Sequence, residues 1–231
     1  MTIKNTCDTT LFVRRCFFQL HLFQGNIMAR QTKENTEQTR LNIINAGLNT
    51  FLQKGYSKTT LQDIATAAGV TRGAVYWHFK NKKDVFYAVA HVAFEPLDFF
   101  WEEQLNSIDD PSDWIRNLLS RWMHELTHNT MLENAVRLIL QQTEQSSELE
   151  EFFATDLKDS RDCIEQIARV VQLGIDENKF DEQLDPLTTA ATVWAQICGY
   201  ALAYIDFPDL VDWEQAANLQ MNSYLQGLLK T

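Results

Sequence analysis

The segment between residues 59 and 80 constrains the fold most, because two helix start signals lie only a few residues apart. Thr60, with Asp63 three residues later, forms a capping-box pattern that predicts the start of a helix. Gly69 supplies the left-handed backbone that a tight corner between two helices needs. Thr71 is expected to cap a second short helix that ends near His78. The segment therefore predicts two short helices that meet at a tight turn.

The rest of the chain is also expected to be helical. Its 231 residues include only 8 Gly and 4 Pro, and no stretch alternates between apolar and polar side chains. Apolar residues recur at helical spacing over residues 36–54, and Gly55 is expected to end that helix. Asn81 is expected to cap the next one, and Pro96 to stop or kink it. The predicted later helices cover residues 82–95, 97–107, 112–129, 131–144, 148–177, 186–205 and 212–229.

Charge divides the chain into two parts. Residues 28–83 carry a net charge of +6 and residues 84–231 a net charge of −19, although the whole chain carries −11. A basic head on an acidic body is expected of a DNA-binding module joined to a second domain, since acidic surfaces repel phosphate. The four cysteines form no CxxC pair, and no apolar run reaches 18 residues. We therefore expect reduced thiols, a cytoplasmic location and no membrane contact.

These patterns predict an all-α chain with the following domains. Residues 28–83 would form a three-helix helix-turn-helix domain, and residues 84–231 a helical bundle for ligand binding and dimerisation. Residues 1–27 contain an interrupted apolar stretch without a small-residue cleavage site, so a signal peptide is not expected. Met28-Ala29-Arg30 looks like a natural start. We interpret residues 1–27 as a mis-annotated or disordered extension.

The second short helix carries large aromatic side chains and a histidine on its predicted outer face, followed by lysines. Such a face is expected to dock against a partner. The run from Tyr76 to Lys82, YWHFKNK, with Gly69-Val70 before it, resembles the TetR family of transcriptional repressors. Residues 28–95 are most similar to AcrR-type regulators of multidrug efflux pumps. The resemblance implies a non-enzymatic repressor without a cofactor, which binds a palindromic operator in double-stranded DNA and is released by a small-molecule inducer.

The resemblance also implies roles for single residues at the DNA. Arg72 is our candidate for reading a guanine, because its forked guanidinium matches the O6 and N7 acceptors. The remaining contacts that it implies are phosphate contacts, the groove-facing start of the recognition helix, and clamps on the DNA backbone. Thr60 and Tyr76 would contact phosphates, and Thr71 and Gly73 would lie beside Arg72 at the groove-facing start of the recognition helix. The clamps on the DNA backbone would be Trp77, His78, Lys80 and Lys82.

A competing motif lies at residues 124–128, His-Glu-Leu-Thr-His, which matches the H-E-x-x-H pattern of zinc proteases. Two histidines four residues apart on a helix can share a metal ion, with Glu125 as the base. Their predicted helix face is opposite the apolar stripe that includes Trp122, so both histidines are expected to face solvent. No histidine follows His128, and a third ligand would have to be a carboxylate such as Glu144 or Glu148. We therefore predict no metal site, and an exposed adventitious metal site and a zinc hydrolase remain alternatives.

The acidic body is rich in aromatic residues, as expected for a bundle that holds a small-molecule site. The leading hypothesis is a hydrophobic or cationic inducer, and the alternative is a metabolite such as a fatty acyl derivative. The candidate ligand-binding residues combine aromatic and acidic side chains: Phe94, Asp98, Trp101, Trp122, Glu133 and Trp194. The last two helices, about 186–205 and 212–229, are too apolar for single surface helices. We expect them to form the interface of a homodimer.

Overall fold

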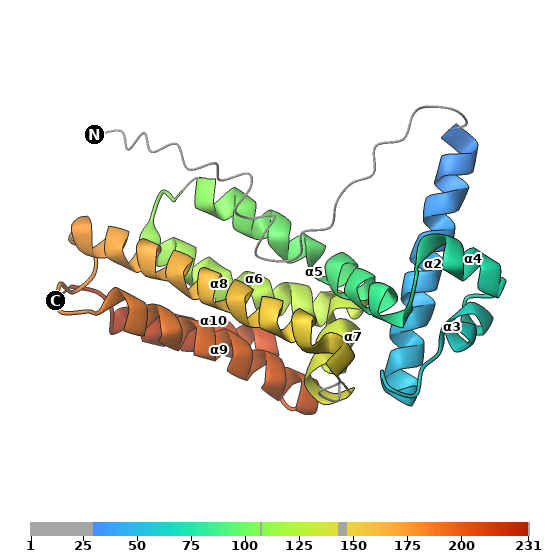
Figure 1. Cartoon of the computed structure of the whole chain (residues 1–231). Coiled ribbons are helices and arrows are strands. Elements are labelled where there is room, and N and C mark those ends of the chain that lie inside the picture. Colours follow the sequence, from blue (N-terminus) through green and yellow to red (C-terminus); the bar gives the residue numbers. More distant parts are fainter. Residues whose placement is uncertain (1–29, 107, 143–146, 231) are drawn as a thin grey trace. The chain divides into compact units, whose positions relative to one another are not determined.

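The computed structural model describes residues 30–106, 108–142 and 147–230 (Figure 1). Over these ranges the chain is helical and contains no strand, apart from an isolated backbone bridge between Phe180 and Leu229. The predicted all-α class is confirmed. None of the helices described is long and apolar enough to cross a membrane. The segment 1–27, which we interpreted as an extension, lies outside the described residues.

The chain folds as two compact units. The head unit comprises residues 30–94 and 129–154, and the bundle unit comprises residues 95–128 and 155–230, within the described ranges. The head unit thus contains the predicted helix-turn-helix domain together with residues 84–94 and a later segment that the sequence analysis assigned to the second domain.

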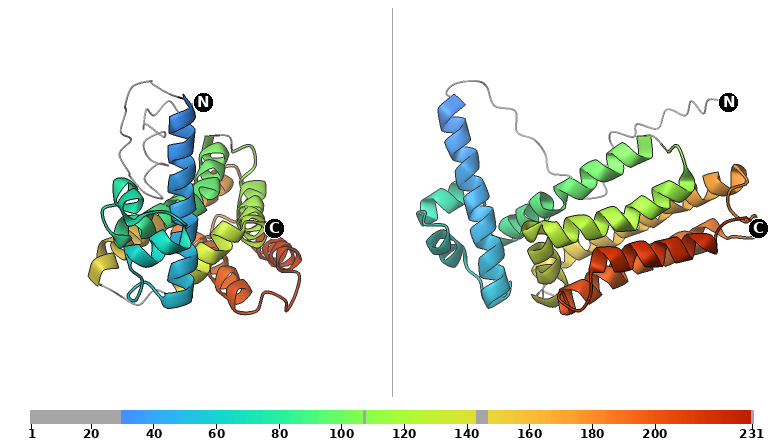
Figure 2. Two further views of the ribbon diagram at one scale, coloured as in Figure 1. Left: turned by 90° about the vertical axis from the view of Figure 1, so that its right-hand side faces the viewer. Right: turned by 180° about the vertical axis from the view of Figure 1, so that it is seen from behind.

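The head unit is built on α2 (Arg30–Lys54), with α3 (Leu61–Ala67) packed on α2 and α4 (Arg72–His78) packed on α3 (Figure 2). It also contains the first half of α5 (Lys82–Asn106), α7 (Thr130–Arg137), the π-helical turn η1 (Leu138–Gln142), the 3₁₀ turn η2 (Ser147–Leu149) and the start of α8 (Glu150–Asp176). A chain of aromatic rings, Phe51, Tyr56, Phe86 and Phe152, forms its core with centroid separations of 5.6, 5.5 and 5.0 Å. This core fixes the helices that carry the exposed face of α4.

The predicted caps and turns of the head are confirmed. Thr60 accepts a hydrogen bond from the Asp63 backbone N–H at 3.2 Å, and Asp63 accepts one from the Thr60 N–H at 3.0 Å. Gly55 and Gly69 have φ angles of +77° and +67°, which residues with a Cβ atom rarely adopt. Thr71 accepts from the Ala74 N–H at 3.2 Å. Local chemistry therefore sets where α3 and α4 begin.

The bundle unit contains α6 (Pro111–His128), most of α8, α9 (Pro186–Asp206) and α10 (Trp213–Gln226). Figures 1 and 2 show these long helices lying side by side. The buried stripe of α6 includes Ile115, Leu119, Met123 and Leu126. Trp122, which the periodicity placed on this stripe, is only partly buried, and Met123 is fully buried instead. The other predicted members of the stripe are buried, so the buried face of α6 is as predicted and only the place of Trp122 is wrong. These members are Ile115, Leu118, Leu119 and Leu126.

The predicted stop at Pro96 is wrong, while the predicted kink stays a prediction. Helix α5 runs through Pro96 to Asn106 as one helix, instead of ending near residue 95. A proline in a helix interior removes one backbone hydrogen bond and costs about 3 kcal/mol. Ala93 and Leu97, on either side of the proline, are almost fully buried, and burial of apolar side chains offsets that cost.

Candidate DNA-binding surface

A hollow of about 590 Å³ opens on the head unit beside α4. Its lining combines hydroxyl, amide and basic side chains from α3, α4 and the turns that flank them. The lining residues are Ser57, Thr59, Thr60, Leu61, Gln62, Arg72, Tyr76, Lys80, Asn81 and Lys82. Five residues that the resemblance assigned to DNA therefore meet in one place: Thr60, Arg72, Tyr76, Lys80 and Lys82.

Arg72 and Tyr76 form a pair on the exposed side of α4. The Arg72 guanidinium donates a hydrogen bond to the Tyr76 hydroxyl at 3.0 Å, and its Cζ lies 5.2 Å from the centre of the Tyr76 ring. Both residues lie on exposed surface. An arginine held in this way loses less side-chain freedom when it meets DNA, because part of its conformational restriction already exists in the folded protein.

The rim of the hollow is stiffened by capping contacts. Asn81 accepts from the Asp84 N–H at 2.9 Å, while Asp84 accepts from the Lys80 N–H at 3.0 Å, so the turn before α5 is fixed from both sides. On the opposite rim, hydrogen bonds from Lys54 and Thr60 lower the pKa of Asp63 to about 2. Asp63 therefore stays ionised at physiological pH and keeps the Thr60 cap in place.

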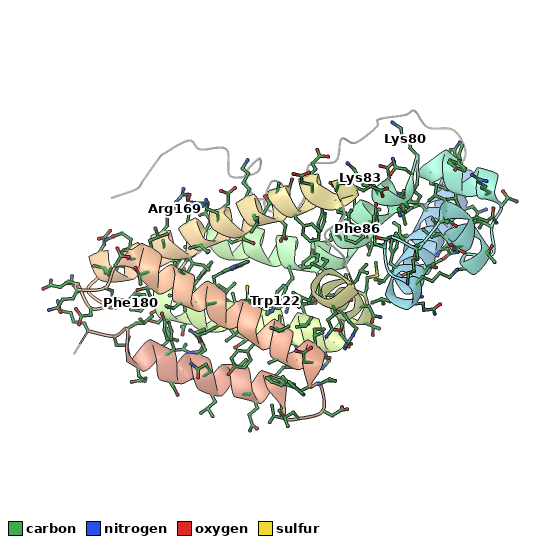
Figure 3. The ribbon with its side chains drawn as sticks, turned by 60° about the horizontal axis from the view of Figure 1, so that its bottom comes forward. Lys80, Lys83, Phe86, Trp122, Arg169 and Phe180 are labelled. Atoms are coloured by element: carbon green, nitrogen blue, oxygen red, sulfur yellow. The ribbon has the colours of Figure 1, made fainter. Side chains whose placement is uncertain are left out.

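Lys82 points toward the protein rather than away from it. Its ammonium donates to the backbone carbonyls of Tyr56 and Ser57, both at 3.2 Å, and lies 4.4 Å from the centre of the Tyr56 ring. The Lys82 side chain is only 20% exposed. Lys80, by contrast, has an exposed side chain (Figure 3). In the structure Lys82 thus links the start of α5 to the turn after α2.

Trp77 and His78 differ in exposure, although they are neighbours on α4. Trp77 is 71% exposed, so most of its indole ring is open to a partner. His78 is half-buried with its ring 4.6 Å from the Trp77 ring, edge to face. Burial, together with the nearby charge of Arg40, lowers the pKa of His78. His78 is therefore neutral at pH 7 and would meet DNA as a hydrogen-bonding group instead of a cation.

Two acidic partners of the head were not found from the sequence. Glu148 accepts a hydrogen bond from the Tyr56 hydroxyl at 2.9 Å and lies 3.7 Å from the Lys82 ammonium. Glu151 pairs with Lys83 at 3.0 Å. These carboxylates follow their partners by more than sixty residues in the chain, and no local pattern marks such pairs. They neutralise part of the positive charge at the start of α5.

The candidate ligand-binding residues are distributed over both units. Phe94 and Glu133 belong to the head unit, where Glu133 pairs with Arg137 at 3.1 Å. Trp122 and Trp194 belong to the bundle unit, and both are partly buried. The side chains of Asp98 and Trp101 lie outside the described part of the structure. Their grouping into one ligand site therefore stays a prediction.

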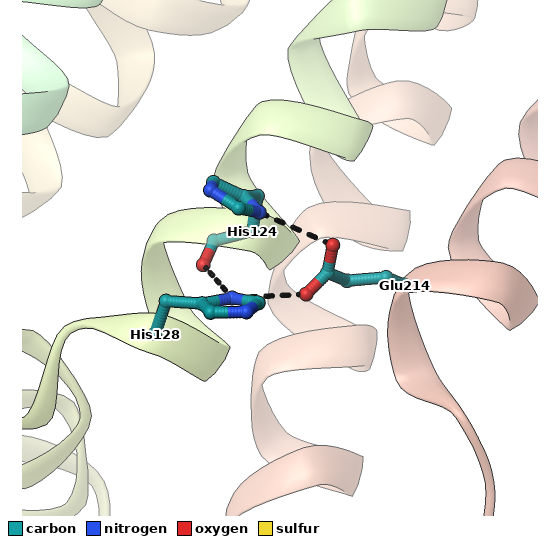
Figure 4. A group of neighbouring side chains, drawn as sticks. All are labelled: His124, His128 and Glu214. Carbon is teal, nitrogen blue, oxygen red and sulfur yellow. Dashed lines mark hydrogen bonds and ion pairs between the residues drawn. The ribbon is translucent and has the colours of Figure 1, made fainter.

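The two histidines of the H-E-x-x-H motif are exposed on α6, as predicted. The carboxylate beside them, however, is Glu214 of α10, whereas the sequence analysis pointed to Glu144 or Glu148 (Figure 4). Glu148 lies in the head unit, next to Tyr56, and Glu144 lies outside the described residues. Choosing candidates by nearness in the chain missed a residue that the folding of α10 against α6 brings close.

Comparison with known proteins agrees with this geometry. Residues 43–89 match the bacterial regulatory proteins of the tetR family. The HTH-type transcriptional regulator TtgR of Pseudomonas putida is 30% identical over 186 residues, which cover 80% of this chain and 89% of that protein. The chain belongs to the TetR family. The predicted resemblance is thus confirmed, and the matched residues 43–89 include α3, α4 and the start of α5.

Three further proteins are similar to this TetR-family chain. The HTH-type transcriptional regulator AcrR of Shigella flexneri is 39% identical over 115 residues, covering 49% of this chain and 52% of that protein. The crystal structure of NalD, the secondary repressor of the MexAB-OprM multidrug efflux pump in Pseudomonas aeruginosa, has a TM-score of 0.75 at 27% identity and covers 85% of this chain and 98% of that one. A fatty acid degradation regulator, FadR from Bacillus halodurans, is 19% identical with a TM-score of 0.63, which shows a shared fold alone.

Proposed function

We propose that this TetR-family protein is a cytoplasmic repressor of an efflux-pump operon that leaves its operator when a small hydrophobic or cationic ligand binds. The observation that carries the DNA-binding part is the hollow beside α4, where Arg72, Tyr76 and Lys80 lie together within residues 28–83, which have a net charge of +6. The likeness to NalD supports the regulated target, and no catalytic role is assigned to the chain.

The proposed contacts are those that the resemblance to the TetR family implies, and the exposure of Arg72, Tyr76 and Lys80 supports them. Arg72 reads a guanine in the major groove, at the start of the helix with Thr71 and Gly73. Thr60 and Tyr76 contact phosphates. The proposed clamps on the backbone, which position the head without reading sequence, are Trp77, His78, Lys80 and Lys82. For Lys82 this contact would require its ammonium to leave the carbonyls of Tyr56 and Ser57.

Dimerisation is proposed through α9 and α10. Exposed apolar side chains lie on both helices: Leu187 and Leu202 on α9 are 55% and 48% exposed, and Leu219 on α10 is 70% exposed. Leucine side chains that are about half exposed or more on these two helices support an interface with another protein chain. A dimer would also present two recognition helices about 34 Å apart, which is the spacing of successive major grooves on one face of DNA. A palindromic operator would then match the symmetry of the protein.

The inducer site is proposed to include the aromatic and acidic residues of the later helices. Phe94, Trp122 and Trp194 offer partly buried aromatic surface, and Glu133 offers a carboxylate, although one that already pairs with Arg137. A cationic ligand would have to compete with that arginine. Titration of the protein–operator complex with assorted lipophilic cations tests this part of the proposal, since an inducer should release the DNA in proportion to its occupancy.

The DNA contacts are tested with Arg72→Ala against two duplexes, the intergenic DNA upstream of the protein's own gene and random DNA of equal length. We expect the variant to lose about 1–3 kcal/mol of binding to the operator and little on random DNA, which relaxes sequence preference. Arg161→Ala, an exposed arginine of the bundle unit, is the control and should leave both affinities unchanged. An equal loss on both duplexes would make Arg72 a phosphate contact and contradict its proposed role.

A further inference from the structure

Three metal-ligating side chains meet on the outside of the bundle unit, where α6 ends and α10 begins (Figure 4). His124 and His128 lie one turn apart in α6, and their rings are 4.3 Å apart at an angle of 30°. Glu214, in the first turn of α10, points its carboxylate at both rings. Within the part of the chain that the structure describes, the ligand atoms of these three residues lie within 4.8 Å of one another.

We propose that His124, His128 and Glu214 bind a divalent transition-metal ion of the zinc class, which joins α6 to α10. Imidazole nitrogens together with a carboxylate oxygen form a donor set that such ions prefer over calcium or magnesium. Three protein ligands leave a fourth position for water. The proposal concerns a part of the chain that the proposed DNA-binding role does not use.

The distances between the Glu214 carboxylate and the two rings fit a shared ion. His124 Nδ1 lies 3.2 Å from one Glu214 carboxylate oxygen, and His128 Nδ1 lies 3.1 Å from the other. Two ligands that each lie about 2.0–2.1 Å from a tetrahedral zinc ion are roughly 3.3 Å from each other. An ion could therefore bind between the carboxylate and each ring when both rings carry the proton on Nε2 and offer the lone pair of Nδ1. His128 Nδ1 lies 3.1 Å from the His124 backbone carbonyl and has to give up that contact to bind the ion.

The ligands are held in place before any ion arrives. The Thr127 hydroxyl donates to Glu214 at 2.7 Å, and the Asp212 side chain caps α10 by accepting from the Gln215 N–H at 2.9 Å. Further along the same pair of helices, Arg116 donates to Asn222 at 3.1 Å, and Ser120 bonds to Asn218. A polar seam thus fixes the register of α6 against α10. Pre-oriented ligands and their hydrogen-bonded neighbours raise metal affinity.

The same geometry opposes the zinc-hydrolase alternative. In an H-E-x-x-H protease the glutamate must act as a base at the metal-bound water. Here Glu125 pairs with Arg121 at 2.7 Å, and its side chain is only 16% exposed, whereas the side chains of His124 and His128 are 49% and 63% exposed. The two histidines of the site are also exposed to solvent. We therefore infer a site that binds a metal ion and holds two helices together.

The experiment uses the full-length protein, freed of metal by chelation and dialysis and then titrated with Zn²⁺ by calorimetry. We expect one ion per chain and a higher midpoint of thermal unfolding, because a ligand that binds only the folded state stabilises it. His128→Gln and Glu214→Gln should each weaken binding at least about tenfold, since even residues that only orient metal ligands contribute that much. Titration with Co²⁺ should give the intense visible absorption of a four-coordinate ion.

Three control variants separate this site from other metal-binding groups. Glu125→Gln changes a residue on the same helix turn whose carboxylate pairs with Arg121. His91→Gln and Cys198→Ser remove other groups that could bind a metal ion. All three variants should bind Zn²⁺ as tightly as the parent. The proposal is overturned if the chain binds no zinc at one equivalent. It is equally overturned if His128→Gln and Glu214→Gln bind as tightly as the parent, or if His91→Gln or Cys198→Ser abolishes binding. Because all these side chains are partly or fully exposed, the variants should fold, and circular dichroism checks this.

Discussion

The corner between α8 and α9 is packed so tightly that one added methyl group should lower the stability of the protein. Gly174, near the end of α8, lies against the ring of Phe180, which is 1% exposed. The Phe180 N–H donates to the Gly174 carbonyl at 3.0 Å, so the backbone holds the ring in place. A Cβ added at Gly174 would lie 2.2 and 2.4 Å from two ring carbons. Ordinary contacts between carbon atoms are about 3.5–4.0 Å, so the ring would have to move by more than about 1 Å.

Gly174→Ala should therefore destabilise the protein by about 2 to 3 kcal/mol. Inserting a methyl group into a packed site costs about 1–3 kcal/mol, occasionally more, and this contact is among the tightest possible. The helical preference of alanine over glycine returns up to about 1 kcal/mol. For a chain of this size, each kcal/mol lowers the unfolding midpoint by about 2–4 °C, so we expect a decrease of about 4–12 °C at fixed protein concentration.

Differential scanning calorimetry of the variant and two companions measures this effect. Gly73→Ala is the control, because its new Cβ meets only the Thr71 hydroxyl at 3.8 Å, and it should stabilise the chain slightly. Combining Gly174→Ala with Phe180→Leu should cost less than the sum of the two single changes, because the smaller side chain makes room for the methyl group. A Gly174→Ala variant that melts at or above the parent temperature would refute the packing argument.

The remaining predictions concern charge, assembly and a helix cap. Burial, reinforced by neighbouring carboxylates, raises the pKa of Asp159 from 3.8 to about 7, so the folded state binds this proton more tightly and stability falls as pH rises from 4 through 7. Asp159→Asn should raise the free energy of unfolding, measured in urea, by at most about 4 kcal/mol over the parent at pH 8 and by little at pH 4. An equal increase at both pH values would contradict the raised pKa of Asp159. Leu219→Glu should convert the dimer to monomers in sedimentation, whereas Leu157→Glu, on an equally exposed leucine of α8, should not. Thr60→Ala should lose about 1 kcal/mol of stability through its cap, while Thr66→Ala, inside the same helix, should lose less, and equal losses would argue against the capping box.

Short-range chemistry explains how much of the fold could be predicted from the sequence. Thr60 with Asp63, Gly69 and Thr71 each act within four residues, and the structure confirms the helix boundaries that they predict. The exposed face of α4 was predictable for the same reason, because helical periodicity places its residues. Proline locally disfavours the interior of a helix, but the burial of Ala93 and Leu97 on either side of Pro96 outweighs this cost.

The parts that the sequence did not reveal depend on contacts between distant residues. Glu214 follows His124 by 90 residues, and Glu148 follows Tyr56 by 92 residues. A single sequence contains no signal for such pairs, since any exposed acid on a later helix could fill either place. The inward orientation of Lys82 has the same origin, because the carbonyls that hold it belong to the turn after α2.

The proposed repressor role is tested most directly by the affinity of the purified protein for its own upstream intergenic DNA and for random duplex DNA, measured by fluorescence anisotropy over a range of salt concentrations. This role predicts binding as a dimer, with a preference of at least about 10³ for one palindromic site and an affinity for both duplexes that falls as salt rises. A protein that stays monomeric, or that binds both duplexes equally at low salt, would contradict it.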